Sequence, residues 1–250
     1  MLNQINSVLK SKNWHSNQRL RMFILLCIST LFNFALLGYR MYHLEFNYTQ
    51  IDAVKNIDML KGTTSFLFLV WNLFLAWIPY WIAISMGSIH RQFSSWLLTG
   101  TCLIGWLLFF PNAPYILTDF LHLRSRAPIP QWYDLMLIAS FAWTGLILGL
   151  LSLYEVQRFL KDQIGNRLAW VIAICCIFLC GFGIYVGRFL RWNSWDVFTR
   201  PIDLITQLVE VVSRPDIYGN TVGISLVLGV FLLLAYLKMV LLIDAKVILR

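Results

Sequence analysis

The chain has 250 residues, of which 59% are hydrophobic and only 13% are charged. Soluble domains carry about 25% charged residues, so this composition excludes an ordinary soluble protein. The net charge of +8 does not indicate nucleic-acid binding, because no Lys/Arg-rich run with interleaved aromatic residues extends outside the apolar segments. Basic residues beside such segments instead anchor loops at anionic lipid headgroups.

Six long and almost uncharged runs follow one another along the chain. Each reaches about 18 residues or more, enough for a helix to cross ~30 Å of hydrocarbon. The runs are continuous rather than alternating, which favours helices over strands. We therefore expect an all-α polytopic transmembrane bundle of about six helices, forming a single membrane domain (22–250) after a polar tail (1–21). The expected spans lie near 22–39, 63–86, 94–111, 134–154, 168–187 and 217–237.

The orientation follows from the basic residues that precede the first span, Lys10, Lys12, Arg19 and Arg21. Positive charge at this position favours a cytoplasmic N-terminus. An even number of spans puts both termini on one side, and we expect that side to be the cytoplasm of a bacterial cell, with the protein in the inner membrane. The two polar connections, 112–132 and 188–216, then share the outer side.

Two spans carry pairs of glycines one helical turn apart. Gly145 and Gly149 form a GxxxG motif in the fourth span, and Gly183 and Gly187 form another in the fifth. Small residues at this spacing let helices approach closely in lipid. We expect these glycines to serve packing within the chain rather than dimerisation.

The third span runs into an unusual polar stretch, FPNAPYILTDFLHL. Proline is favoured in the first helical turn, so Pro114 predicts a short interfacial helix near 114–123. Asp119 and His122 are three residues apart and share a face of that helix. Ionisable groups beside apolar sequence are costly and are commonly functional. Asp134 opens the next span.

A second polar stretch, GRFLRWNSWDVFTRP, follows the fifth span. Arg188 and Arg191 again share a helix face, and Asn193, Trp195 and Asp196 follow at once. We expect this cluster to lie against Asp119, His122 and Asp134, because buried charges in a membrane need partners.

Pro201 begins an amphipathic segment that predicts a helix near 201–213. Its polar face carries Asp203 and Glu210 rather than lysines. A helix that binds anionic lipid would be basic, so we expect this helix to roof the bundle.

The two stretches together offer the groups of a candidate site. Guanidinium groups match phosphate oxygens, so the arginines could clamp a phosphate-bearing lipid. The carboxylates could hold Mg²⁺ or Mn²⁺ or act as a base, and the imidazole could be a ligand or general acid. The candidate catalytic residues are Asp119, His122, Asp134 and Asp196. The candidate substrate-binding residues are Arg188, Arg191, Asn112, Asn193 and Trp195.

The segments FPNAPYILTD and GRFLRWNSWD, with the Trp-x-Asp at Trp132 and Asp134, resemble the domain of unknown function 1361 family. The resemblance spans roughly Trp106 to Pro201 and extends over most of the bundle, leaving out the N-terminal tail and first loop. It implies a bacterial multi-pass membrane protein, and it implies no activity, substrate or cofactor.

Three functions remain open on the sequence. The first is an enzyme or lipid-acting site at the outer leaflet, where tryptophans would bound a lipid phosphate. The second is a non-catalytic scaffold or assembly factor whose polar clusters lock the outer loops together. The third is a transporter, which the nearly uncharged spans and the lack of a visible repeat disfavour.

Overall fold

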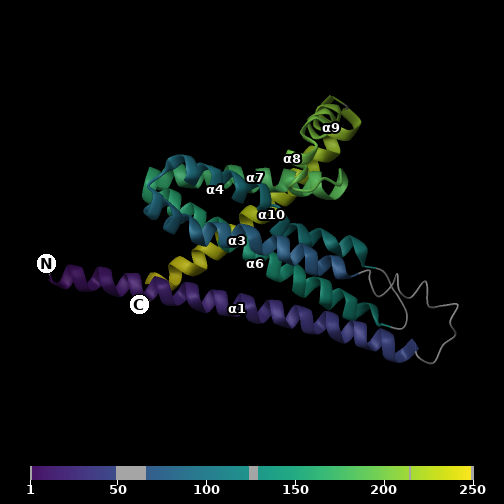
Figure 1. Ribbon diagram of the computed structural model, residues 1–250, viewed down its shortest axis with the longest axis horizontal. Coiled ribbons are helices and arrows are strands. Elements are labelled where there is room, and N and C mark those ends of the chain that lie inside the picture. Colours follow the sequence, from purple (N-terminus) through teal and green to yellow (C-terminus); the bar gives the residue numbers. More distant parts are fainter. Residues whose placement is uncertain (1, 49–65, 124–128, 214, 249–250) are drawn as a thin grey trace.

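The computed structural model describes residues 2–48, 66–123, 129–213 and 215–248, which fold into a bundle of helices (Figure 1). Six of the described helical segments are long and apolar enough to cross a membrane, which confirms the expected all-α polytopic architecture. Residues 63–65, expected to begin the second span, and residues 124–128 of the first polar connection lie outside the described residues.

The spans are carried by six main helices, with four shorter elements between them. The main helices are α1 (Leu2–Tyr48), α3 (Leu67–Phe93), α4 (Trp96–Phe109), α6 (Gln131–Ile164), α7 (Asn166–Phe189) and α10 (Pro215–Ile248). The shorter elements are α5 (Asn112–Tyr115), the 3₁₀ helix η2 (Ile116–His122), α8 (Asp196–Thr199) and α9 (Pro201–Ser213). Helix α1 begins at Leu2, so the segment expected as a polar tail continues the first membrane helix.

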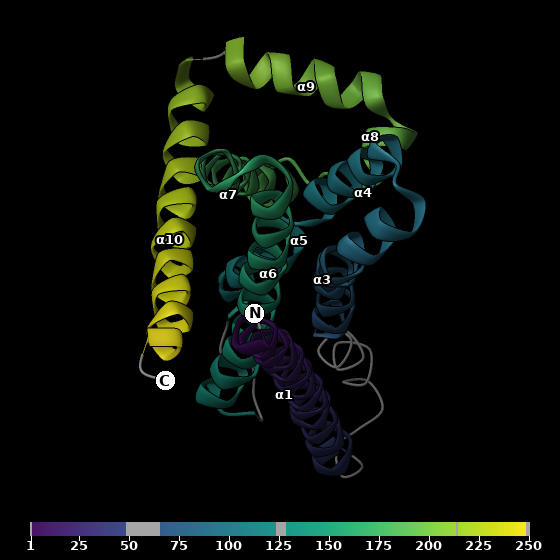
Figure 2. The ribbon, with the colours of Figure 1, turned by 90° about the vertical axis from the view of Figure 1, so that its left-hand side faces the viewer.

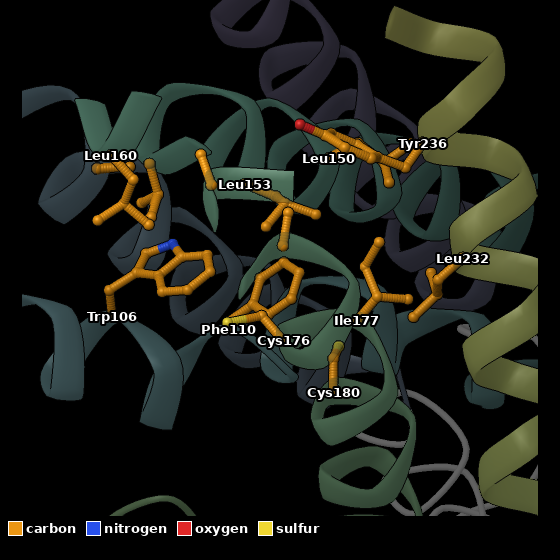
Figure 3. Close-up of a cluster of buried hydrophobic side chains, with 14 of the residues drawn as sticks. Trp106, Phe110, Leu150, Leu153, Leu160, Cys176, Ile177, Cys180, Leu232 and Tyr236 are labelled. Carbon is orange, nitrogen blue, oxygen red and sulfur yellow. The ribbon is translucent and has the colours of Figure 1, made fainter. Parts of the chain in front are cut away.

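Helix α6 is the centre of the bundle, because it packs against α1, α3 and α7. Buried side chains from α4, α6, α7 and α10 form one hydrophobic cluster (Figure 3). In this cluster Trp106 stacks on Phe110, and its indole N–H donates to the Ser152 hydroxyl at 3.3 Å. Lipid chains are as apolar as these side chains, so close packing rather than water exclusion holds the helices together.

Two ion pairs join α1 and α6 and show that the helices run antiparallel. The Arg19 Nε donates to Glu155 Oε1 at 2.8 Å, and the Arg40 Nε donates to Asp134 Oδ1 at 2.7 Å. Arg40 follows Arg19, and Glu155 follows Asp134, by the same number of residues, which a helix spans in about 32 Å. This length is close to the ~30 Å thickness of the hydrocarbon core.

The third span is a broken helix rather than a continuous one. Helix α4 ends at Phe109, and the chain then forms the single turn α5 and the 3₁₀ helix η2. The expected short helix near 114–123 is therefore present, but it starts at Asn112, is largely 3₁₀, and buries one of its faces in the bundle. Ala113, Ile116 and Asp119 are completely buried. Irregular backbone is tolerated at membrane depth when protein surrounds it.

The glycines of the two GxxxG motifs form the surface against which this broken segment packs, and we call that surface its seat. A Cβ on Gly145 would lie 2.5 Å from the Ala113 carbonyl oxygen, and one on Gly183 would lie 2.6 Å from Pro111 Cγ. Gly149 and Gly187 contact Pro114 and Tyr115 in the same way. The glycines therefore pack within the chain, as expected, but their partner is the PNAPY turn rather than another long helix.

Helix α9 confirms the expected amphipathic helix at 201–213. It crosses over one end of the bundle instead of running along it, as Figures 1 and 2 show. The beginning of α1 and the end of α10 lie together at the opposite end (Figure 1). The polar stretches after α4 and α7 thus belong to the half of the molecule that α9 covers.

Candidate functional site

Arg188, in the last turn of α7, contacts three side chains of η2. Its Nε donates to Thr118 Oγ1 at 2.7 Å, its Nη1 lies 2.9 Å from His122 Nε2, and its Nη2 donates to Asp119 Oδ1. A guanidinium only donates, so the His122 Nε2 is the acceptor in this contact. The sequence prediction that Asp119 and His122 share a face toward an arginine therefore agrees with the structure.

Asp119 accepts a hydrogen bond from Arg188 and another from Asn72 of α3. Its second oxygen, Oδ2, accepts from Asn72 Nδ2 at 3.0 Å. The Arg188 guanidinium also lies over the Tyr115 ring, 4.7 Å from its centroid. Because a buried charge is costly unless it is paired and hydrogen-bonded, these contacts are what allow an ionised arginine at this depth. They also leave Arg188 little freedom to move.

The position of the Asp119–Arg188 pair along the bundle follows from its contact with α3. Arg40 lies over the Phe66 ring, 4.1 Å from its centroid, just before α3 begins. Asn72 follows Phe66 by about 9 Å along the helix. The Asp119–Arg188 pair, which Asn72 contacts, therefore lies about this far along α3 from Arg40, and Asp119 belongs to the span Trp96–His122, where ionisable residues are expensive and are commonly functional.

Asp134 does not join this cluster, so its expected place beside Asp119 is wrong. Its carboxylate accepts two hydrogen bonds from Arg40, from Nε at 2.7 Å and from Nη2 at 3.2 Å. Both side chains are 1% exposed. The partner of Asp134, Arg40 of α1, lies one residue beyond the span expected at 22–39. This pair fastens α1 to α6, and it is separate from the hydrogen bonds of Asp119 with Arg188 and Asn72.

Asp196 also has its own partners and does not contact Asp119. Its Oδ2 accepts from the backbone N–H of Asn193 at 2.8 Å and from the Asn193 side chain at 3.2 Å, and Arg200 lies 3.5 Å away. The bond from the Asn193 backbone lowers the pKa of Asp196, with smaller contributions from Thr199 and Arg200. Asp196 therefore shapes the loop between α7 and α8 as a carboxylate.

Asn112 ties the broken helix to the loop after α7. Its Nδ2 donates to Ser194 Oγ at 2.8 Å and to the Phe109 carbonyl at 3.1 Å, and Ser194 in turn donates to the Leu108 carbonyl at 3.0 Å. Trp195, half-exposed in the same loop, lies edge-on to Trp71 of α3. These contacts fix the loop that carries Arg191.

Arg191 differs from every other candidate. It has a positive φ of 61°, a conformation that costs a non-glycine residue about 1 kcal/mol. The next N–H, of Trp192, donates to the Val186 carbonyl at 3.3 Å, so the chain reverses sharply here. The Arg191 side chain is exposed, and no acidic partner for it occurs among the residues that the structure describes. Glycine is usual at such a helix end, so an arginine there suggests a function.

Arg188 and Arg191 both line a large cavity of about 1000 Å³. The two arginines lie at its polar end, together with Asn72, Asn112, His122 and Asn193. Asp119 is not part of the lining, which makes the exposed polar surface cationic. Most ligand cavities are apolar with a few converging polar groups, and this cavity has that character.

The rest of the cavity is apolar. Its walls come from α4 (Leu107, Leu108), from α7 (Leu179, Phe182), and from α9 (Leu204, Leu208). Trp192 donates from its indole to Gln207 Oε1 and so holds α9 over the space. Ile104 and Leu179 line the cavity and are nevertheless 69% and 52% exposed. The apolar lining is therefore exposed along both α4 and α7.

The carboxylates that the sequence offered for Mg²⁺ or Mn²⁺ do not converge. Asp119, Asp134 and Asp196 each bind a different arginine or amide. Among the described residues no group of three or more His, Cys, Asp or Glu side chains could hold a metal ion. What the arrangement presents to a ligand is positive charge and hydrogen-bond donors.

Sequence reasoning missed Asn72, Tyr115 and Thr118. Asn72 could have been found, because a lone amide inside an apolar run needs a hydrogen-bond partner and so indicates a polar contact. Thr118 and Tyr115 could not have been found in this way, since both are common at helix ends and boundaries. Their role depends on the 3₁₀ turn that brings them under Arg188.

No curated protein and no solved structure matches the chain. A family model described as "Protein of unknown function (DUF1361)" matches residues 71–235. The match includes every residue that lines the cavity, from Trp71 to Leu208, and leaves out α1. This integral membrane protein therefore belongs to the DUF1361 family.

Proposed function

We propose that this protein binds a phosphate-bearing lipid of the outer leaflet, with the phosphate between Arg188 and Arg191 and the hydrocarbon in the cavity under α9. The observation that carries the proposal is Arg191, an arginine in a costly backbone conformation whose side chain lines a cavity and has no acidic partner among the described residues. Guanidinium groups bind phosphate through paired, charge-assisted hydrogen bonds.

The shape of the cavity supports a lipid rather than a soluble anion. A soluble phosphate compound would need only the polar end, whereas most of the lining is apolar and parts of it on α4 and α7 are strongly exposed. A lipid could enter between α4 and α7 without leaving the bilayer. Its phosphate would then meet Arg188, which Asp119, Thr118 and His122 already hold in place.

A purely structural cluster explains part of the site but not all of it. The pair of Asp119 with Arg188 and the pair of Asp134 with Arg40 are complete braces. Neither of them requires Arg191, and a brace would not leave a cationic surface on an open cavity. Binding of an anion accounts for both the braces and the arginine.

The membrane and orientation expected from the sequence are part of the proposal. Positive charge before the first span supports cytoplasmic termini in a bacterial inner membrane, which puts α9 and the polar end of the cavity on the outer side. In a cysteine-free background, Ser213→Cys should react with an impermeant maleimide on whole cells. Ser94→Cys, in the turn between α3 and α4, should react only after lysis, and the reverse pattern would invert the orientation.

The binding proposal is tested by ligand-induced stabilisation of the purified protein. A ligand that binds only the folded state raises the melting temperature, and the rise grows with the ratio of the ligand concentration to its dissociation constant. Dioleoyl phosphatidate should raise it, and dioleoylglycerol, which lacks the phosphate, should not. Arg191→Gln should abolish the shift, because a charge-assisted bond contributes about 1.5–3 kcal/mol.

The matched control is Arg200→Gln, which removes an exposed arginine from the next connection along the chain, between α8 and α9. Arg200 does not line the cavity and contacts Asp196 and Trp192 instead. This variant should keep the phosphatidate shift. Equal loss in both variants would reduce the effect to general attraction between a basic surface and an anionic lipid, and the proposal would fail.

A further inference from the structure

A second, smaller cavity of about 180 Å³ lies beside the first. Its walls come from α7, α9 and α10, and they are almost entirely apolar. The residues that line it include Phe178, Phe182, Leu208, Val211, Val222 and Ser225. A ligand whose hydrocarbon occupied only the first cavity along α4 and α7, here called the α4–α7 groove, would leave this second cavity empty.

Two side chains line both cavities, Phe182 of α7 and Leu208 of α9. They are therefore the partition between the two spaces. From the polar end at Arg188, apolar surface leads in two directions, along the α4–α7 groove and past this partition to α10. The proposed headgroup site thus has two apolar spaces near it, the α4–α7 groove and the second cavity behind Phe182 and Leu208, and we call these spaces its two branches.

The depth of the second branch suits a hydrocarbon chain. Phe182 and Phe178 precede Arg188 on α7 by about 9 and 15 Å of helix, respectively. The Phe178 ring is held against α10, where a Cβ on Gly229 would lie 2.5 Å from it. The wall that Phe178 forms is consequently fixed, and the space beside it does not close by a simple shift of the ring.

One polar atom in the second branch lacks a partner. The Ser225 hydroxyl oxygen is buried and makes no hydrogen bond within the part of the chain that the structure describes. A buried hydroxyl without a hydrogen-bond partner costs free energy. Polarity therefore does not explain why position 225 carries a serine rather than a leucine. The small serine instead keeps the branch open.

From these observations we infer that the ligand is a two-chain lipid phosphate, with one chain in the α4–α7 groove and the other in the branch beside α10. This inference rests on the proposed phosphate-binding function and adds the class of lipid. A single-chain phosphate, such as a lysophospholipid or an isoprenoid phosphate, would fill only one branch. It would gain nothing from the space that Phe178 and Ser225 keep open.

The test compares two ligands with the same headgroup, dioleoyl phosphatidate and 1-oleoyl lysophosphatidate, by native mass spectrometry of the purified full-length protein. The wild type should bind phosphatidate more tightly. Ser225→Leu fills the second branch, and it should weaken phosphatidate binding about tenfold, less than the burial of a few methylenes contributes. Lysophosphatidate binding should stay within about twofold, which also reports that the variant is folded.

A second variant and a control keep the result clear. Val222→Phe fills the same branch from a neighbouring position and should reproduce the selective loss. Ser85→Leu, the same substitution at an exposed position of α3, should change neither affinity. If both filling variants bind phosphatidate as tightly as the wild type, or lose both ligands equally, the two-chain assignment is wrong. If the wild type binds dioleoylglycerol as tightly as phosphatidate, the proposed phosphate site itself fails.

Discussion

Asp119 and Arg188 form an ion pair in which the carboxylate is enclosed and the guanidinium is partly open, with side chains 1% and 12% exposed, respectively. Both Asp119 oxygens are used, by Arg188 and by Asn72. Arg188 has five N–H groups and donates three of them to η2. The two residues therefore have different roles. Asp119 holds the Arg188 guanidinium in place, and Arg188 keeps N–H groups that a ligand could use.

Asp119→Asn should destabilise the protein by about 3–5 kcal/mol, because it leaves the charge of Arg188 without its buried partner. Thermal unfolding in detergent measures the effect. Asp203→Asn, on the exposed face of α9, is the control and should stay within about 0.5 kcal/mol. An unchanged melting temperature for Asp119→Asn would show that this pair does not brace the fold.

Arg191→Gly, unlike Asp119→Asn, should leave the fold stable and remove ligand binding. Glycine adopts the left-handed conformation at position 191 without the penalty of about 1 kcal/mol that arginine incurs, so the melting temperature should stay the same or rise. The stabilisation by phosphatidate should disappear. Arg191→Ala keeps the backbone penalty and should lose the ligand effect without the gain in stability. A strongly destabilised Arg191→Gly would mean that Arg191 supports the fold instead of a ligand.

The seat of the broken helix is tested by adding one methyl group. Gly145→Ala places a Cβ against the Ala113 carbonyl, at 2.5 Å, where backbone would have to shift. We expect destabilisation by about 1–3 kcal/mol, typical of overpacking. Gly105→Ala, in α4, meets no atom within 4 Å and should be neutral or stabilising. Equal tolerance at both positions in a melting experiment would contradict the tight seat.

Asp196 predicts a dependence of stability on pH. Its pKa is lowered in the folded protein, chiefly by the Asn193 backbone N–H. Its contribution is therefore present above the unfolded pKa of about 3.9 and is lost as pH falls through the lower folded pKa. Asp196→Asn should melt below the wild type near neutral pH, and the gap should shrink in strong acid. A gap that is constant over this range would exclude the carboxylate as its source.

The membrane helices were predictable because length and apolarity alone determine them. Helix α9 was predictable from its periodicity. Facing of Asp119 and His122 toward an arginine also followed from spacing, since both lie on one short helical segment. These features are local in the chain, and local patterns suffice to predict them.

The pairing of charges was not predictable from local patterns. Asp134 seemed to belong with Asp119 because both adjoin the same connection, yet it pairs with Arg40 of α1. Arg40 stands one residue beyond the first apolar run, so it was assigned to a loop, although it is 2% exposed. Which carboxylate meets which arginine depends on how α1 and α6 cross, and that is a tertiary property.

The break in the third span was only half predictable. Pro111 and Pro114 signalled an end to the helix, but nothing local placed the following turn inside the bundle. The glycines that receive it lie on α6 and α7, more than 30 residues away along the chain. The cavity forms beside this seat, so its existence could not be read from either segment alone.

The most direct test of the central claim is an electron cryomicroscopy map of the protein in nanodiscs that contain dioleoyl phosphatidate. The account predicts density for a phosphate within hydrogen-bond distance of both the Arg188 and Arg191 guanidinium groups, about 2.7–2.9 Å from the nitrogens. Density for hydrocarbon should continue into the cavity under α9. An Arg191 side chain paired with a carboxylate of the protein, beside a cavity without phosphate density, would contradict the account.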